Sequence, residues 1–377
     1  MIRHNSTMLR RFYNSIISSM MLFLNKGINP QTLIFFITSR CNATCDFCLY
    51  KDFLNDKASK DSELSLDEIE RLSKQYGKLH FLSLSGGEPF IRRDIVDICE
   101  LFIKNSATKV VDIPSNCFYT ERIVDSLTQL CERNENVMFQ LQLSLDHIGT
   151  EHDRIRGVKG LYEKAKRTFN ELNDLDLKNL KLNINIVYLD DNKKEIPAII
   201  SKAKSDFNCD RITLGYLNNL IKKNELSDSF YDFKKTSNQV VVEGISKIIN
   251  PFVLGMKAVT LLTNDLLEKA LSEEVKTSKY CKAGENIVVV TEKGDVFPCE
   301  PTWESIGSLR DFNYDIRRVL NSNKYHEFYE NMLKNSDCNC SWSCAMTSAV
   351  ATDRKLLLKL PPKIISLFGE LAKNLVK

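Results

Sequence analysis

The feature that most constrains the fold is an alternation of two kinds of segment between residues 32 and 217. Runs rich in β-branched and aromatic residues alternate with charged stretches of helical spacing. The apolar runs are TLIFFITS (32–39), LHFLSLS (79–85), KVVDIPS (109–115), FQLQLSLD (139–146), LKLNINIVYL (180–189) and RITLGYL (211–217). Strands that alternate with helices build a parallel sheet. The sequence therefore predicts an α/β fold with a parallel sheet, open or closed as a barrel.

One stretch between these runs shows why the intervening segments are expected to be helical. In SLDEIERLSKQY (65–76), Ser65 has the character of an N-cap, and Glu68 follows three residues later, as in a capping box. Leu66, Ile69 and Leu72 follow at helical spacing. We therefore expect a helix over 65–76.

Polar signals follow the first four apolar runs: Ser-Arg-Cys, Ser-Gly-Gly-Glu, Pro-Ser-Asn and Ser-Leu-Asp. The carboxyl ends of parallel strands meet at one edge, where α/β proteins place their active sites. The sequence therefore predicts one catalytic rim formed by these segments. The 52 basic and 49 acidic side chains nearly cancel, so global charge gives no argument for nucleic-acid binding.

A chain of 377 residues is long enough for one large domain and a smaller one. Changes in composition along the chain divide it into five segments. The expected divisions are an N-terminal amphipathic helical segment (1–31), an α/β core (32–220), a helical connector (221–280), a small cysteine-rich auxiliary domain (281–345) and a basic amphipathic tail (346–377).

Half of the twelve cysteines fall in two tight clusters, at 41, 45 and 48 and at 338, 340 and 344. Close neighbours along the backbone are poorly placed to form disulfides, and clustered cysteines in a reducing cell indicate metal ligands. Three thiolates can hold an iron–sulfur cluster and leave one iron without a protein ligand. A structural zinc ion prefers four closed ligands, so zinc is the less favoured alternative.

The triplet Cys41-x3-Cys45-x2-Cys48, with Phe47 directly before its last cysteine, resembles the signature of radical S-adenosylmethionine (radical SAM) enzymes. The resemblance implies that the three cysteines hold a [4Fe–4S] cluster whose open iron binds S-adenosylmethionine. It implies a partial (β/α)6 TIM-type barrel. It also implies reductive cleavage of the cofactor to a 5′-deoxyadenosyl radical, which abstracts a hydrogen atom from a substrate.

Further residues resemble the cofactor contacts of that family. Gly86-Gly87-Glu88-Pro89 resembles the motif that meets the methionine amino group; glycines allow a close backbone approach, and a carboxylate accepts from an ammonium. The polar positions that meet the ribose and carboxylate are matched by Asn116, Ser144, Asp146 and Arg156. The ordinary alternatives are a strand-to-helix turn, turn residues and a surface arginine. Asn192 matches a position with a structural role.

The C-terminal cysteines resemble the auxiliary-cluster extension called SPASM, or its shorter relative called twitch. They are Cys281, then Cys299 after a glycine-turned hairpin, then Cys338, Cys340 and Cys344. A full SPASM extension has about seven cysteines for two clusters, so five favour one auxiliary [4Fe–4S] cluster. Cys281, Cys299 and Cys344 are its expected ligands, with Cys340 or Cys338 as the fourth. A zinc site is the alternative.

Both chain ends combine apolar and basic residues. Residues 8–24 carry an apolar stripe beside Arg10 and Arg11, and the tail from Lys355 is basic and amphipathic. Such segments lie on anionic membranes or pack on the protein itself. The apolar run 16–24 is shorter than the about 20 residues that a membrane span needs. The expectation is a cytoplasmic protein, with peripheral contact at the inner membrane face as an option.

The substrate class stays open between a sugar or other small molecule, a lipid precursor and a peptide. The 40 residues before Cys41 are too few for a leader-binding domain plus the first strand. The family resemblance implies an electron donor such as flavodoxin or ferredoxin, and no nucleic-acid partner is expected. A non-catalytic electron-transfer or zinc-stabilised binding protein is the alternative, but it would not need Gly86 to Pro89, Asn116 and Asp146.

The remaining candidates receive a structural interpretation. Isolated cysteines are usually buried thiols. This expectation covers Cys99, Cys117, Cys131 and Cys209. His147 and His152 lie near the predicted rim without ligand spacing, so we expect solvated or hydrogen-bonded histidines.

Overall fold

The computed structural model describes residues 30–55, 59–216, 228–243, 251–272, 279–334 and 340–376. The strands are β1 (Thr32–Thr38), β2 (Phe81–Gly86), β3 (Val110–Ser115), β4 (Met138–Ser144), β5 (Leu180–Tyr188), β6 (Arg211–Tyr216), β7 (Ile287–Val290), β8 (Asp295–Phe297) and β9 (Gly307–Ser308). Each apolar run of the sequence forms one of the first six strands. The predicted α/β fold is therefore confirmed.

The α-helices are α2 (Ser59–Ser62), α3 (Leu66–Tyr76), α4 (Ile95–Ser106), α5 (Thr120–Arg133), α6 (Gly149–Arg156), α7 (Leu161–Asp174), α8 (Ile196–Asp206), α9 (Asp228–Glu243), α10 (Pro251–Leu271), α11 (Ile316–Val319), α12 (Asn323–Lys334), α13 (Ser343–Thr352), α14 (Arg354–Leu357) and α15 (Leu360–Val376). Short 3-10 helices are η1 (Lys51–Phe53), η2 (Pro89–Ile91) and η4 (Leu309–Phe312).

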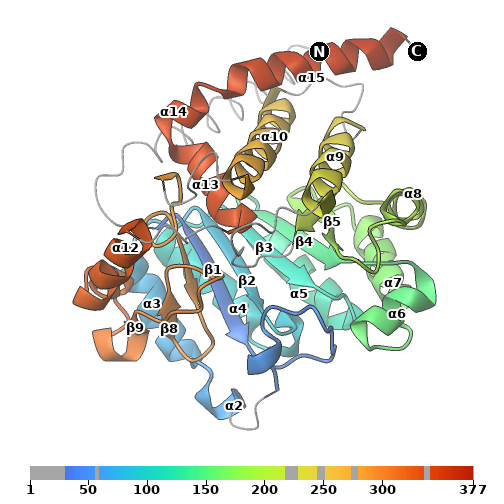
Figure 1. Cartoon of the computed structure of the whole chain (residues 1–377). Helices are drawn as coiled ribbons and strands as arrows, with labels where there is room; N and C mark the ends of the chain where they lie inside the picture. Colours follow the sequence, from blue (N-terminus) through green and yellow to red (C-terminus); the bar gives the residue numbers. More distant parts are fainter. Residues whose placement is uncertain are drawn as a thin grey trace, which may run out of the picture. The chain divides into compact units, whose positions relative to one another are not determined.

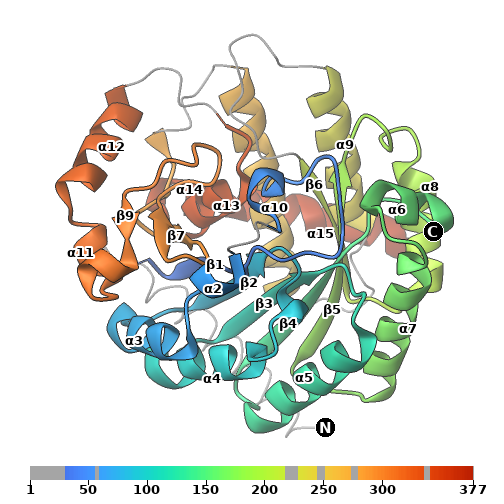
Figure 2. The ribbon, with the colours of Figure 1, turned by 90° about the horizontal axis from the view of Figure 1, so that it is seen from below.

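The sheet is open, with strand order β6-β5-β4-β3-β2-β1-β7-β8-β9. Neighbours from β6 to β1 pair in parallel, as the βα alternation predicts. Helices α3, α4, α5 and α7 cover its outer face, and the strands fan out behind them (Figures 1 and 2). The carboxyl ends of β1 to β5 therefore face one rim, as the partial-barrel prediction requires.

The burial pattern explains why these segments form these elements. In β4 the residues alternate between buried and half-buried positions, which matches the period of a strand. In α3, Ile69, Leu72 and Tyr76 are buried, so one helical stripe packs toward the sheet. The predicted capping box is present, since Ser65 accepts from the Glu68 backbone N–H and the Glu68 side chain accepts from the Ser65 N–H.

The glycine-turned hairpin that leads to Cys299 is also present. β7 and β8 pair antiparallel, and Gly294 adopts a φ of 89° in the connection. Its place in the molecule was not predicted: β7 pairs in parallel with β1, with Thr32 opposite Ile287. The hairpin therefore extends the main sheet beyond β1.

The described residues fall into two compact units. One unit contains the sheet, with residues 30–216 and 283–334; the other contains the described residues between 228 and 282 and between 340 and 376. Helices α9 and α10 of this second unit lie within the stretch 221–280 predicted as a helical connector, while residues 1–29 lie outside the described residues. The functional division into five segments stays a prediction.

The basic tail forms α14 and α15 in the second unit. Leu367 of α15 is buried against Leu254, Ala258 and Leu261 of α10, so part of its apolar face packs on the protein itself. Ile365 and Phe368 remain 69% and 40% exposed. Among the described residues, no helix is both long and apolar enough to cross a membrane.

Candidate functional site

The cysteine triplet lies on a loop that leaves the carboxyl end of β1. Asn55 pins the start of this loop, since its amide accepts from the Cys41 N–H at 3.0 Å and donates to the Cys41 carbonyl at 3.1 Å. Farther along, the Thr44 N–H donates to the carbonyl of Arg156 at 3.0 Å. Hydrogen bonds therefore join the start of the loop to its end at Asn55, and the middle of the loop to the end of α6.

The three thiols share one environment. Burial raises the pKa of Cys41 to about 12 and also raises the pKa values of Cys45 and Cys48. The nearby Arg156 guanidinium opposes this shift at Cys45 and Cys48. Negative charge on Cys45 and Cys48 would in turn raise the pKa of Cys41, so the thiols lie within electrostatic reach of one another.

The donor set fits a [4Fe–4S] cluster: three thiols on one loop, one buried and two half-buried, close to a fixed cation. Within the described residues, no three His, Cys, Asp or Glu side chains lie close enough together to hold a metal ion. The Cys41 sulfur instead accepts a 3.4 Å hydrogen bond from the Ala43 N–H. Ligation would thus require side-chain rotation in the loop.

Gly86 and Gly87 bring the end of β2 against the cysteine loop. A Cβ on Gly87 would lie 2.2 Å from the Arg40 carbonyl oxygen, and one on Gly86 would lie 2.3 Å from that of Thr38. The N–H groups of Gly87 and Glu88 donate to those same carbonyls, of Thr38 and Arg40, at 2.8 and 2.9 Å. In this structure the close approach that glycine permits is to the loop backbone.

Glu88 lies buried behind this contact. Its carboxylate accepts from the Ser115 hydroxyl and the Asn116 N–H, both at 2.8 Å, and from the Phe90 N–H at 3.3 Å. Burial raises the pKa of Glu88 to about 7, although these hydrogen bonds act in the opposite direction. Pro89, also buried, begins η2 directly after it. The carboxylate thus joins the ends of β2 and β3.

Asn116 follows β3 and is buried as well. Its amide nitrogen donates to Asn42 Oδ1 at 2.9 Å, and its oxygen accepts from the Phe118 N–H at 3.0 Å. The Asn42 amide nitrogen is buried and has no hydrogen-bond partner among the described residues. The β3 end therefore contacts the cysteine loop, and one buried donor of that loop is left unsatisfied by the described part of the chain.

Asp146 and Arg156 form a buried ion pair beside the loop. The Arg156 Nε and a terminal nitrogen lie 2.7 and 2.5 Å from Asp146 Oδ2, and the Asp146 side chain is 0% exposed. The other Asp146 oxygen accepts from the Val187 N–H at 3.1 Å. The Arg156 guanidinium also lies 5.5 Å from the centre of the Phe47 ring. Arg156 is therefore an interior cation, not the surface arginine of the alternative.

Ser144 ends β4 beside this pair. It is half-buried, and its hydroxyl has no hydrogen-bond partner among the residues that the structure describes. Asn192 is fully buried and bonds to backbone atoms of Leu189, Val187 and Asp146, in keeping with a structural role. Ser144 thus differs from the other predicted polar cofactor contacts, because its hydroxyl is available to hydrogen-bond a ligand.

The histidines near the rim are hydrogen-bonded, as expected. His152 is buried and accepts from the Asp146 N–H at 3.3 Å, and burial lowers its pKa to about 3. His147 accepts from the Ile148 N–H at 2.9 Å. Of the isolated cysteines, Cys99, Cys117 and Cys131 are buried as predicted, whereas Cys209 is half-buried.

The C-terminal cysteines divide between the two compact units. Cys299 is buried just after β8 in the sheet unit, while Cys281, Cys340 and Cys344 belong to the second unit. Cys340 is buried, Cys281 is half-buried and Cys344 is exposed in the first turn of α13. Cys338 lies outside the described residues. Shared ligation of one auxiliary cluster stays a prediction.

Sequence reasoning missed an aromatic anchor behind the cysteine loop. The Tyr50 hydroxyl donates to Glu292 at 2.5 Å, and its ring lies 4.8 Å from Phe36 and 5.5 Å from Trp303, centre to centre. Burial and the Glu292 carboxylate raise the pKa of Tyr50. No local motif joins residues so far apart in sequence, since the pairing of β1 with β7 brings them together.

Residues 35–203 match the family model of the radical SAM superfamily. This stretch contains the cysteine triplet, Gly86 to Pro89 and Arg156. The match identifies this stretch of the chain as a radical SAM domain. The predicted family is confirmed, and with it the [4Fe–4S] cluster and S-adenosylmethionine as the cofactors that such a domain implies.

Among curated proteins, the chain is similar to GTP 3′,8-cyclase from Clostridium perfringens, with 33% identity over 172 residues. That match covers 44% of this chain and 50% of the relative, so the chain spans about half the length of that protein. It is also 24% identical over 279 residues to a probable GTP 3′,8-cyclase from Methanocaldococcus jannaschii, covering 72% of this chain and 86% of the relative.

Two solved structures share the fold. Native anSMEcpe with bound AdoMet matches with a TM-score of 0.58 at 16% identity, covering 92% of this chain and 100% of the other. Streptococcus suis SuiB bound to S-adenosylmethionine matches with a TM-score of 0.57 at 17% identity, covering 82% of this chain and 70% of the other. At these identities the likeness concerns the fold alone.

Proposed function

We propose that this chain is an enzyme that cleaves S-adenosylmethionine reductively at a [4Fe–4S] cluster held by Cys41, Cys45 and Cys48. The single observation that carries the proposal is the docking of the cysteine loop. Gly86 and Gly87 admit its backbone at contact distance, and Arg156 places a buried cation beside its thiols. A loop held in this way suits a cluster that keeps one iron open for a cofactor.

When bound, the reduced cluster and S-adenosylmethionine supply the 5′-deoxyadenosyl radical that abstracts a hydrogen atom from the substrate. The protein contributes position and charge. Arg156 offsets the negative charge of the thiolates, and Asp146 fixes its guanidinium through two contacts to one oxygen. Because the pair is buried, its charges act on the thiolates through a lower local dielectric than that of water.

The remaining polar residues are proposed to hold the cofactor itself. An ionised carboxylate has about four lone-pair sites, and the three contacts made by Glu88 leave room for an ammonium of the methionine part. The available Ser144 hydroxyl suits a ribose hydroxyl or a carboxylate oxygen. Asn116, which donates to Asn42 of the cysteine loop, and Phe47, whose ring lies against Arg156, are proposed to complete this cofactor site.

The reaction on the substrate is proposed at a coarser level. Oxidation or another C–H modification of a sugar, a lipid precursor or a peptide is the first candidate. The relatives named GTP 3′,8-cyclase favour a second candidate, a cyclisation of a purine nucleotide. Adding GTP to the reduced enzyme with S-adenosylmethionine should then raise the yield of 5′-deoxyadenosine. An unchanged yield would reject the cyclase candidate.

Three accessory features belong to the same proposal. An auxiliary [4Fe–4S] cluster would be held by Cys281, Cys299, Cys344 and one of Cys338 and Cys340. A flavodoxin or ferredoxin would supply the electron. Peripheral membrane contact through α15 is supported by the exposed Ile365 and Phe368.

The cluster proposal can be tested spectroscopically. Anaerobically reconstituted protein, reduced with dithionite, should give the electron paramagnetic resonance signal of a reduced [4Fe–4S] cluster. Addition of S-adenosylmethionine should change this signal, because the cofactor binds to the open iron. A signal that does not respond to the cofactor would favour the non-catalytic electron-transfer protein. Tight zinc binding without iron would favour the zinc-stabilised alternative.

A further inference from the structure

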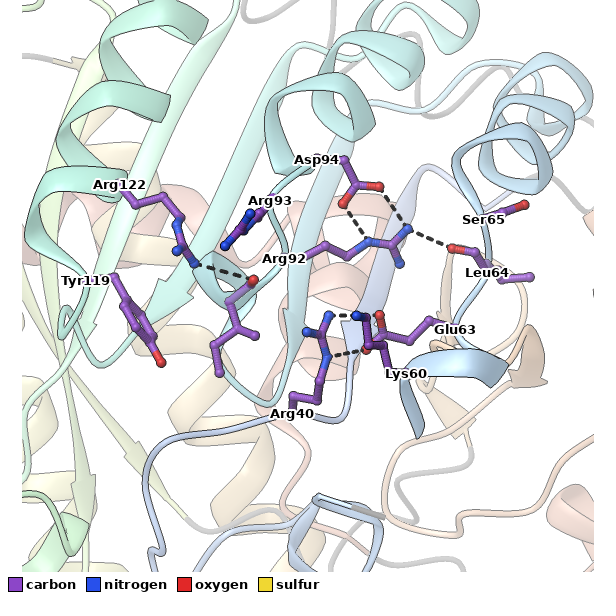
Figure 3. A pocket seen from close by; sticks show the side chains of 11 residues that line it. Arg40, Lys60, Glu63, Leu64, Ser65, Arg92, Arg93, Asp94, Tyr119 and Arg122 are labelled. Atoms are coloured by element: carbon purple, nitrogen blue, oxygen red, sulfur yellow. Dashed lines mark hydrogen bonds and ion pairs between the residues drawn. The ribbon is translucent and has the colours of Figure 1, made fainter. Parts of the chain in front are cut away.

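A large cavity opens in the sheet unit next to the cysteine loop but outside the constellation described above. Its volume is about 770 Å³, within the about 300–1,000 Å³ of ordinary ligand sites. Its lining comes from the end of β1, the segment from α2 to α3, the segment after η2 and the start of α5 (Figure 3). The residues are Arg40, Lys60, Glu63, Leu64, Ser65, Ile91, Arg92, Arg93, Asp94, Tyr119 and Arg122.

Both carboxylates of this lining are already neutralised. Glu63 takes two contacts of 2.9 Å from Arg40 and a further hydrogen bond from the Thr38 hydroxyl. Asp94 takes contacts of 2.8 and 3.1 Å from Arg92, whose remaining nitrogen donors reach the carbonyls of Ile37 and Leu64. Arg40, Arg92 and their partners therefore form a neutral, fixed wall.

The other cations have no such partner. Among the described residues, neither Lys60, Arg93 nor Arg122 forms an ion pair with a carboxylate. Arg93 and Lys60 are exposed to the cavity and to solvent. In the close-up, Arg93 lies between Arg122 and Arg92 (Figure 3). The cavity therefore carries an excess of three positive charges.

Two contacts fix the position of the Arg122 guanidinium. One of its nitrogens donates to the Phe90 carbonyl at 2.5 Å, and its guanidinium lies 5.1 Å from the centre of the Tyr119 ring. These contacts fix the planar group without neutralising its charge. A fixed guanidinium binds an oxyanion at a smaller cost in side-chain entropy than a mobile one.

We infer that this cavity binds an oxyanion of the phosphate class through Lys60, Arg93 and Arg122. Arginine forks match phosphate oxygens in pairs, and the lysine adds a point charge. Neutralisation of three gathered cations supplies the driving force. The site is distinct from the proposed cluster and cofactor contacts, and the inference does not depend on the proposed function. Arg40, which precedes Cys41 in the chain, forms the wall shared with the cysteine loop.

The test measures binding of inorganic pyrophosphate to the whole protein by calorimetry, at low ionic strength and without S-adenosylmethionine or reductant. Wild type should bind, and the affinity should fall as salt is added. Arg93→Gln should weaken binding at least about tenfold, equal to about 1.4 kcal/mol. Because Arg93 is exposed and makes no hydrogen bond among the described residues, this variant should fold normally. Arg122→Gln, which also loses the contact to Phe90, is the second variant.

The matched control is Lys178→Gln, which removes an exposed cation far from the cavity lining in sequence. It should bind pyrophosphate as wild type does. Wild type that binds neither phosphate nor pyrophosphate would overturn the inference, and so would equal affinities of Arg93→Gln and the control. If those anions fail to bind while Arg93→Gln weakens a complex with flavodoxin, the cavity is part of a protein-docking surface and the inference is wrong.

A second arm distinguishes free phosphate from the phosphate groups of a nucleotide. If GTP competes with pyrophosphate and loses affinity in Arg93→Gln, the cavity takes nucleotide phosphates. If GTP does not compete while pyrophosphate binding depends on Arg93, the cavity takes free phosphate or pyrophosphate. Either result supports the anion site, and neither depends on radical chemistry.

Discussion

Arg156 illustrates what a single side chain contributes at this rim. It contacts the Phe47 ring, neutralises Asp146 and lies beside the thiol of Cys45. The family motif predicted that Asp146 and Arg156 both belong to the site, but not that they pair with each other. Pairing depends on how α6 returns toward β4, and no local sequence pattern encodes that geometry.

The buried pair leads to the first prediction. Asp146→Asn should lower the free energy of unfolding by about 3 kcal/mol, because it leaves the Arg156 charge buried without its partner. Chemical denaturation at pH 7 measures the change. Asp191→Asn, at an exposed carboxylate in the loop after β5, should change stability by less than about 0.5 kcal/mol. Equal losses in the two variants would contradict a stabilising role for the pair.

Glu88 gives a prediction for pH dependence. Its pKa is about 7 in the folded protein, above the about 4.3 of an unfolded glutamate. Between these values the folded state binds more protons, so the contribution of Glu88 to stability is lost as pH rises from about 4 to about 8. The loss amounts to about 3 kcal/mol.

Glu88→Gln cannot titrate, so it serves as the reference. The variant should be less stable than wild type at low pH, because it replaces an acceptor with an amide donor. The difference in unfolding free energy between the two proteins should shrink by about 3 kcal/mol between pH 4 and about 8. Parallel pH profiles would mean that folding does not raise the pKa of Glu88.

At the scale of elements, the sequence predicts the parallel strands and helix α3 well, because each carries a local period or cap. It predicts the β7–β8 hairpin for the same reason, through Gly294. It does not predict that β7 pairs with β1, because that contact joins segments about 250 residues apart and depends on packing across the whole sheet. The Tyr50–Glu292 hydrogen bond was missed for the same reason.

The contact between the β2 turn and the cysteine loop gives the third prediction. Gly87→Ala places a Cβ 2.2 Å from the Arg40 carbonyl oxygen, so the loop backbone must move. After anaerobic reconstitution, the cluster held by this loop should therefore contain less than half of the iron that it contains in wild type. Retention of full iron content and cofactor response would show that the loop tolerates displacement.

Gly255→Ala is the matched control for this change. A Cβ on Gly255, within α10, meets no atom within 4 Å. Because alanine is the better helix former by about 0.5–1 kcal/mol, this variant should be slightly more stable than wild type. Its iron content should be unchanged.

At the scale of the whole molecule, the sequence predicts the radical SAM domain from motifs spread over four strand ends. The second cysteine group cannot be assembled in the same way, since Cys299 belongs to one unit and Cys281, Cys340 and Cys344 belong to the other. The cation-lined cavity was not predicted either. Its residues come from four separate segments, and only the Arg92-Arg93 pair after the Gly-Gly-Glu-Pro motif marks it locally.

The number of clusters gives the fourth prediction. A variant with Cys41, Cys45 and Cys48 all changed to alanine should keep about four irons per chain after reconstitution, held by the auxiliary cysteines. Iron and sulfide analysis measures this directly. About eight irons would mean two auxiliary clusters, and none would mean that the C-terminal cysteines hold no iron cluster.

The most direct measurement of the central claim is the formation of 5′-deoxyadenosine. Reconstituted wild type, given dithionite and S-adenosylmethionine without oxygen, should release it together with methionine. Cys45→Ala should abolish it, while Cys131→Ala, at a buried thiol outside the loop, should retain it in the folded fraction. If reconstituted wild type with bound iron forms no 5′-deoxyadenosine, or if Cys45→Ala forms as much as wild type, the assignment of the loop as a radical SAM centre is wrong.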